Sequence, residues 1–148
     1  MDLDLLSRSQ LEAEYRRTDY IVDDDGLRFT IRLDRSNTGL DETLRSLQVS
    51  SWAFLTACNP YSKALTEQQN ESRQHQLTKL LDENGYRYLR AKGIGDGWQE
   101  PSLFIIEITR DAAIDIGKRF EQNAILWGAA DAEPELIWCV DLEPKSPE

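Results

Sequence analysis

The residues of this chain that are best suited to hold a ligand lie on one face of a predicted helix, from Thr66 to about Asn84. At 100° per residue, the leucines at 77, 80 and 81 define the core-facing stripe of this helix, and Asn70 and Arg73 continue it toward the N-terminus. A buried guanidinium needs a partner, because an unpaired charge away from water is costly. The partner is either a structural carboxylate, for instance Glu100, or the anion of a ligand. The sequence leaves both alternatives open.

Two polar segments are expected to meet this end of the helix. Asn59 and Ser62 follow a buried strand, at the kind of strand end where α/β sheets bind ligands. Trp98, Glu100 and Ser102 enter another strand, after glycines at 93, 95 and 97 that we interpret as a flexible loop. Backbone amides in that loop could also approach an anion, although the glycines open no helix and form no nucleotide-binding fingerprint. Trp98 either stacks on a base or sugar or covers the edge of the core.

Other candidates for chemistry are weaker. Glu100 with Asp96 would be a carboxylate pair for acid–base work, which makes Glu100 the candidate catalytic residue, although loop carboxylates usually only contact solvent. His75 is the single histidine and falls on the opposite side of the helix from Arg73. Neither a metal site nor a dyad of His75 with Cys58 is therefore expected. We also expect no cofactor.

The elements that must position these residues alternate between hairpins and helices. The expected order is helix, two strands, helix, strand, helix, two strands, helix, two strands. Capping signals place the first helix after Ser9, the long helix after Thr66 and the last helix after Asp111. The pattern predicts a single α/β (α+β) domain over residues 1–148, with a mixed β-sheet, hairpins, three to four packed helices and a frayed tail from about residue 143.

Composition disfavours several classes of protein. The net charge is −10, from 17 basic and 27 acidic residues, which argues against broad binding to nucleic acid or anionic membranes. No stretch approaches the roughly 20 apolar residues of a membrane span, and no basic region precedes an apolar segment at the acidic N-terminus. Two distant cysteines suit a reducing compartment. We therefore expect a soluble, acidic, cytoplasmic protein without a membrane partner.

Four separated blocks of the chain look like parts of one known family. They are SWAFLTAxNPYS from Ser51 to Ser62, NxxR from Asn70 to Arg73, WxEPS from Trp98 to Ser102, and FxQNAILWG from Phe120 to Gly128. With these blocks the chain resembles, over residues 15–130, a family of uncharacterised bacterial proteins that is classified only as a domain of unknown function. The resemblance implies a small bacterial cytoplasmic protein and carries no reaction. It adds Gln122 and Asn123, which either cap a helix-to-strand junction or line a pocket.

The first functional hypothesis is a domain that binds a small molecule or nucleotide through its anionic group, with catalysis left open. In this hypothesis Arg73 holds the anion, Asn59 and Asn70 orient the ligand, and Trp98 stacks on it. The expected ligand-binding residues are Asn59, Ser62, Asn70, Arg73, Trp98, Glu100, Ser102, Gln122 and Asn123.

The second hypothesis is a non-enzymatic interaction module that docks its acidic surface on a protein partner. Asp131, Glu133, Glu135 and the C-terminal tail would form part of that surface. A closed ion pair at Arg73 with no cavity beside it would favour this hypothesis over the first.

Overall fold

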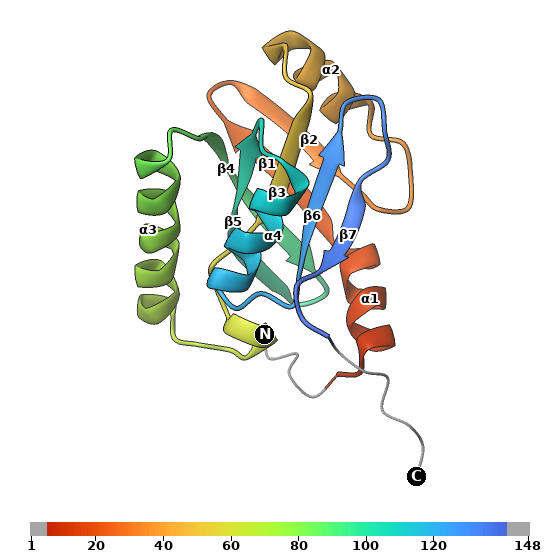
Figure 1. Ribbon diagram of the computed structural model, residues 1–148. Helices are drawn as coiled ribbons and strands as arrows, with labels where there is room; N and C mark the ends of the chain where they lie inside the picture. The colour runs from red at the N-terminus through yellow and green to blue at the C-terminus, as the bar shows by residue number, and fades with distance from the viewer. Residues whose placement is uncertain (1–5, 142–148) are drawn as a thin grey trace.

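The structure, a computed structural model, describes residues 6–141 of the 148-residue chain, so the expected frayed tail lies outside the described residues. Helices and strands follow one another in the predicted order, with one short 3-10 helix added (Figure 1). Their bounds are α1 (Arg8–Arg17), β1 (Asp19–Asp24), β2 (Leu27–Ile31), α2 (Thr38–Leu47), β3 (Ser51–Leu55), η1 (Pro60–Ser62), α3 (Glu67–Glu83), β4 (Arg87–Gly95), β5 (Trp98–Ile106), α4 (Arg110–Arg119), β6 (Ala124–Ala129) and β7 (Glu135–Trp138).

The strands of the described residues form one sheet in the order β2-β1-β4-β5-β3-β6-β7. Each pairing in it is antiparallel. Helix α3 connects β3 to β4, and these two strands run in the same direction with β5 between them. Helix α4 connects β5 to β6, which also run in the same direction, with β3 between them. The predicted single α+β domain is confirmed. The expected mixture of parallel and antiparallel pairs is corrected, because an antiparallel strand lies between the two strands that each of these helices links.

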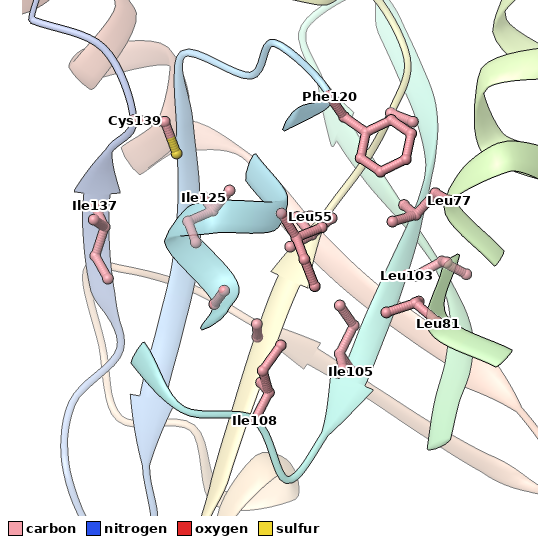
Figure 2. Close-up of a cluster of buried hydrophobic side chains, with 14 residues drawn as sticks. Leu55, Leu77, Leu81, Leu103, Ile105, Ile108, Phe120, Ile125, Ile137 and Cys139 are labelled. Carbon is pink, nitrogen blue, oxygen red and sulfur yellow. The ribbon is translucent and has the colours of Figure 1, made fainter. Parts of the chain in front are cut away.

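Both faces of the central strands are buried, which explains why their sequences are almost entirely apolar. Along β3, Ala53 and Leu55 face a core that α3 and α4 cover, while Trp52 and Phe54 face the opposite side. Figure 2 shows the first core, which also contains Leu77, Leu81, Leu103, Ile105, Ile108, Phe120, Ile125, Ile137 and Cys139. On the second side, α2 and the β1–β2 hairpin pack against Trp52 and Phe104, whose rings stack 5.5 Å apart. The sheet therefore separates two cores.

Two helices begin earlier than predicted. Ser7, and not Ser9, caps α1 and forms a capping box with Gln10. The helix therefore begins at the Ser-x-x-Gln pattern that lies two residues before the predicted cap. Thr109, and not Asp111, caps α4, since its side chain accepts from the backbone N–H of residue 112. Between residues 6 and 141, the structure contains no helix that is both long enough and apolar enough to cross a membrane.

The glycines at 93 and 95 lie inside β4 and not in a flexible loop, which corrects the prediction for this segment. The turn to β5 is confined to Asp96 and Gly97, where Gly97 has a φ of +75°. Antiparallel register places Gly95 opposite Trp98, and a Cβ atom at Gly95 would overlap the indole ring. Glycine is therefore required at position 95 because the indole lies directly against the backbone of β4.

Replacing Gly95 by alanine should lower the free energy of unfolding by about 2 kcal/mol, because the new methyl group displaces the Trp98 indole. Gly93→Ala is the matched control in the same strand. A Cβ atom there would lie 3.6 Å from its nearest heavy atom, in Thr18, which is an ordinary contact. Urea unfolding of both variants measures the difference, and equal destabilisation by the two substitutions would contradict this account.

Candidate functional site

A pocket opens where α1 and β1 approach the ends of β3, β5 and β6, with a cavity of about 80 Å³. Space of this size accepts several water molecules, a small ligand or one end of a larger ligand. The predicted site residues in its wall are Asn59, Ser62, Trp98, Glu100, Ser102 and Gln122. The predicted Asn70, Arg73 and Asn123 are not among the residues that line it. Asn70 and Asn123 contact the wall residues Asn59 and Ser62 from behind, whereas Arg73 contacts Ala57, which does not line the pocket.

Alternation along β5 brings part of this wall together. Trp98, Glu100 and Ser102 are spaced by two residues and all line the pocket. Across the sheet, register aligns Tyr20 of β1 with Gly93 of β4, and Gly93 with Glu100 of β5. Gly93 lines the cavity between them, and a Cβ atom there would lie 3.6 Å from the Thr18 side chain and 3.7 Å from the Trp98 ring. The glycine-rich segment thus contributes to the site through room within a strand, and not through backbone amides in a loop.

The orientation of Glu100 is fixed by a pair of asparagines. The Asn59 Nδ2 atom donates to the Glu100 Oε2 atom at 2.6 Å. The Asn59 Oδ1 atom accepts from the Asn70 Nδ2 atom at 2.8 Å and from the backbone N–H of Leu65 at 3.1 Å. The Asn70 Oδ1 atom in turn accepts from the backbone N–H of Asn59 at 2.9 Å. Because the Asn59 Oδ1 atom accepts both of these hydrogen bonds, the Nδ2 atom of the same amide must face the Glu100 carboxyl group.

The segment from Asn59 to Ser62 has an uncommon backbone conformation. Asn59, Tyr61 and Ser62 have φ values of 49°, 52° and 62°, in the left-handed region. The Tyr61 N–H donates to the carbonyl of Glu121 at 2.6 Å, and Asn123 Nδ2 donates to Ser62 Oγ at 2.8 Å. Left-handed non-glycine residues cost on the order of 1 kcal/mol or more each, and they concentrate at functional sites. The loop is therefore held by its contacts in a conformation that places Asn59 and Ser62 in the wall.

Glu100 has the most perturbed carboxyl group of the site. Burial raises its pKa to about 7, while the hydrogen bond from Asn59 acts in the opposite direction. No ion pair joins Glu100 to a lysine, arginine or histidine among residues 6–141. A carboxyl group with this pKa exchanges its proton near neutral pH, which is the property that acid–base chemistry requires.

Arg73 lies at the core-facing end of the polar stripe, as helical phase predicts, but its contacts are structural. Its Nε atom donates to the carbonyl of Ala57 at 2.6 Å, and its Nη2 atom donates to the carbonyl of Phe120 at 2.6 Å. The remaining contact is an ion pair with Glu121 at 3.4 Å, and not with Glu100. The structure thus favours the structural alternative for Arg73, with a different carboxylate from the one suggested by the sequence.

Gln122 supports the same junction from the other side. Its side chain is buried, and its Nε2 atom donates to the carbonyls of Cys58 and Phe120, both at 3.1 Å. Together with Arg73 it ties the segment after β3 to the end of α4. Gln122 is both a wall residue and a structural link.

Sequence reasoning missed the aromatic side of the pocket, which α1 and β1 supply. Tyr15, Thr18 and Tyr20 line it together with Glu14. The Tyr20 hydroxyl donates to the carbonyl of Tyr15 at 2.7 Å, and the Thr18 hydroxyl donates to that of Glu14 at 2.7 Å. The signal in the sequence was a tyrosine on the same helix face as Leu11, just before the alternating strand that carries Tyr20.

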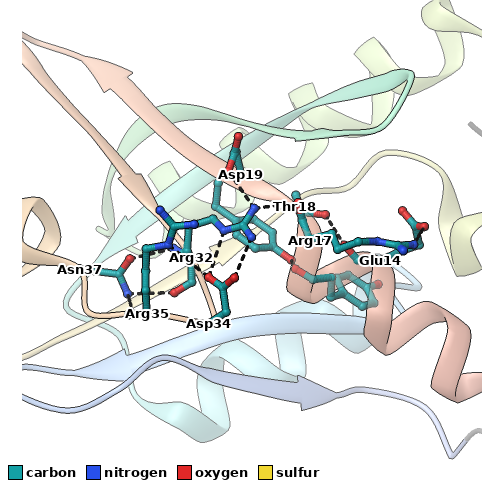
Figure 3. A network of polar contacts seen from close by, with 10 residues as sticks. Glu14, Arg17, Thr18, Asp19, Arg32, Asp34, Arg35 and Asn37 are labelled. Atoms are coloured by element: carbon teal, nitrogen blue, oxygen red, sulfur yellow. Dashed lines mark hydrogen bonds and ion pairs between the residues drawn. The ribbon is translucent and has the colours of Figure 1, made fainter.

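The junction of α1 and β1 is anchored by Arg32, as Figure 3 shows. The Arg32 Nη1 atom donates to the carbonyl of Arg17 at 2.8 Å and pairs with Asp19 at 3.0 Å. Its Nη2 atom pairs with Asp34 at 2.9 Å, and this guanidinium lowers the pKa of Asp34 to about 2. The network ties the chain on both sides of Thr18 to the end of β2. It therefore positions the aromatic side of the pocket.

The remaining candidates lie elsewhere. His75 is exposed, as predicted. Burial raises the pKa of the Cys58 thiol to about 11, so this thiol is protonated at neutral pH and a poor nucleophile. Asp96 lies in the β4–β5 turn and does not line the pocket. No cluster of histidine, cysteine and acidic residues that could hold a metal ion occurs in the part of the chain that the structure describes.

The acidic residues of the interaction hypothesis surround the turn from β6 to β7. Asp131, Glu133 and Glu135 are exposed, and Glu135 pairs with Arg110 of α4 at 3.2 Å. The C-terminal tail of that hypothesis lies outside the described residues. None of these three acidic residues lines the pocket.

Comparison with known proteins finds a match to one protein family over part of the chain. Residues 55–125 match the model of a family described as "Protein of unknown function (DUF3293)". The resemblance to a domain of unknown function is thus confirmed, over a shorter stretch than expected, and this stretch contains each predicted site residue. Neither a curated protein nor a solved structure matches the chain. The bacterial source stays a prediction.

Substitution of Arg73 by methionine should lower the free energy of unfolding by about 3 kcal/mol, because the carbonyls of Ala57 and Phe120 lose their donors. Arg73→Lys should recover part of this loss, since an ammonium reaches one carbonyl but not both. Urea denaturation of the two variants measures the effect. A fully stable Arg73→Met protein would show that the guanidinium is not a structural link.

The stability of the protein should depend on the ionisation of Glu100. Its pKa is raised from 4.5 in the unfolded chain to about 7 in the folded protein, so the folded state retains a proton that the unfolded state releases. The stabilisation is complete below about pH 4.5 and is lost as the pH rises through about 7, by on the order of 3 kcal/mol. The difference in unfolding free energy between wild type and Glu100→Gln, measured in urea across this range, reports the loss.

Exposed Glu83→Gln is the control for this pH experiment, because Glu83 lies in the last turn of α3 and outside the pocket. Its pH profile should run parallel to that of the wild type. Parallel profiles for Glu100→Gln and wild type would show instead that Glu100 titrates in the folded protein as it does in the unfolded chain.

Proposed function

We propose that this protein binds a small polar molecule in the pocket around Glu100. The observation that carries the proposal is a carboxyl group with a pKa of about 7 in the wall of a cavity that polar and aromatic side chains share. Concave sites that combine apolar surface with a few converging polar groups are the usual places of ligand binding. A strongly perturbed carboxyl group within such a site is a further mark of function.

The hydrogen bonds behind the wall support the proposal, because they fix the orientation of the side chains that face the cavity. Asn70 fixes Asn59, which fixes Glu100. Arg73 and Gln122 join the segment after β3, which leads into the left-handed loop, to the segment that follows α4. A core without a function would be simpler with apolar side chains at these positions. The proposed binding centre is therefore Glu100, with Arg73 as a support and not as the group that contacts the ligand.

The size of the pocket favours a small ligand over a complete nucleotide. Sites for drug-sized molecules enclose roughly 300 Å³ or more, whereas this cavity measures about 80 Å³. A ligand of few atoms, or one polar end of a longer molecule, fits the space between Tyr20 and Glu100. If the protein is an enzyme, Glu100 is the residue we expect to transfer a proton, because its pKa is close to neutral pH.

Fragment screening by two-dimensional NMR tests this function. A panel of small amines, amides, alcohols and carboxylates should contain members that shift the backbone N–H signals of Trp98, Gln99, Glu100 and Ser102. Gly93→Ala narrows the cavity without a clash, and it should weaken binding of those fragments about tenfold, equivalent to ~1.4 kcal/mol. Lys79→Ala, an exposed change on α3, is the matched control and should leave binding unchanged. A panel without any member that shifts these amides would refute the proposal.

A further inference from the structure

The charge of the pocket wall restricts the ligand. Among the described residues that line the cavity there are two carboxyl groups, those of Glu14 and Glu100, and no lysine, arginine or histidine. Glu14 forms an ion pair with Arg17, so its charge is compensated on the protein. Glu100 has the asparagine as its partner, and an asparagine contributes a hydrogen bond but no countercharge. Among residues 6–141, the ionised Glu100 is therefore a negative charge at the cavity without an ion pair to a lysine, arginine or histidine.

The aromatic part of the wall also favours a positively charged ligand. Tyr15, Tyr20, Phe54 and Trp98 line the cavity. The faces of aromatic rings carry negative electrostatic potential and attract organic cations, most strongly for tryptophan. Burial raises the pKa of Tyr15 and of Tyr20, so both phenols are neutral and no tyrosinate competes with Glu100 as the anionic group. A carboxylate surrounded by aromatic rings is an environment that stabilises a positive charge and repels an anion.

We propose that the pocket selects a small organic ammonium ion, which pairs with the Glu100 carboxylate and lies against the rings of Tyr15 and Trp98. This inference rests on the proposed function and adds the charge class of the ligand. It replaces the anion that the position of Arg73 suggested in the sequence, because the Arg73 donors are engaged by the carbonyls of Ala57 and Phe120 and by Glu121.

Protonation links binding to pH in a defined direction. An ammonium ion pairs with the ionised form of Glu100, so binding must displace the proton that the carboxyl group holds below a pH of about 7. An alkylammonium ion keeps its own proton up to about pH 10. Affinity should therefore rise with pH while the charge of the ligand stays constant. A neutral ligand of the same size would show no such dependence on Glu100.

Three probes of nearly equal size separate the alternatives: propylammonium, 1-propanol and propionate. Titration of each into the full-length protein, followed by the N–H shifts of Trp98, Gln99, Glu100 and Ser102, should give the highest affinity for propylammonium at about pH 8. At about pH 5.5 the affinity for propylammonium should be about thirtyfold lower, the ratio set by a pKa of about 7. The affinity for 1-propanol should change little between the two conditions.

Variants assign the effect to one carboxyl group. Glu100→Gln keeps the shape of the side chain and should abolish both the preference for propylammonium over 1-propanol and its pH dependence. Glu83→Gln is the control, because Glu83 is exposed in the last turn of α3 and lies outside the pocket, and it should leave both unchanged. The same result for Glu100→Gln and wild type would overturn the assignment.

The outcomes also separate this inference from the proposed function. If propionate or 1-propanol binds at residues 98–102 as tightly as propylammonium, the pocket binds small molecules but not by positive charge, and the inference alone fails. If none of the probes and no member of the fragment panel shifts these amides, the proposed function fails together with it.

Discussion

The fold depends at one point on the fork of a single guanidinium. Arg73 donates to a carbonyl just beyond β3 and to a carbonyl at the end of α4, and these two chain segments are separated by more than half of the matched family region. An arginine can make both contacts at once because its donors are rigid and planar. Through Glu121, the same side chain reaches the residue whose carbonyl holds the left-handed loop. The position of the polar wall depends on this link, together with the hydrogen bonds of Gln122 to the carbonyls of Cys58 and Phe120.

A second constraint is the burial of the sheet on both faces. The central strands have apolar residues on each side, so a pocket can form only where one face lacks a side chain or ends in polar groups. Both conditions occur at the same place. Gly93 leaves a gap in the row that Tyr20 and Glu100 complete, and the alternation of β5 turns from Phe104 to polar residues toward its beginning. The cavity is thus a local interruption of an otherwise continuous core.

Much of the fold was predictable from the sequence. Alternation and capping signals predicted the order of helices and strands, and the long helix begins at the expected capping box of Thr66 and Gln69. Strand directions were not predictable, because a helical crossover does not reveal whether a third strand lies between the two that it connects. The glycines at 93 and 95 were misread for a related reason. Composition does not distinguish a flexible turn from a strand whose glycine accommodates a ring on the neighbouring strand.

The candidate site was predictable only in part. Helical phase found Asn70 and Arg73 on the inner face of α3, yet it suggested Glu100 as the partner and not Glu121, since the position of Glu121 depends on how α4 ends. The contribution of Tyr15 and Tyr20 was hidden because these residues lie far from β5 in the sequence and come next to it only through the pairing of β1 with β4. Long-range pairing of this kind leaves no local pattern.

The pocket wall has two origins along the chain. The family match covers residues 55–125 and therefore includes the side that carries Asn59, Trp98 and Glu100, whereas Tyr15 and Tyr20 lie outside it. The two halves meet through the pairing of β1 with β4, and the network around Arg32 holds α1 and β1 to the end of β2. The shape of the cavity therefore depends on two stretches of chain that the pairing of β1 with β4 brings together.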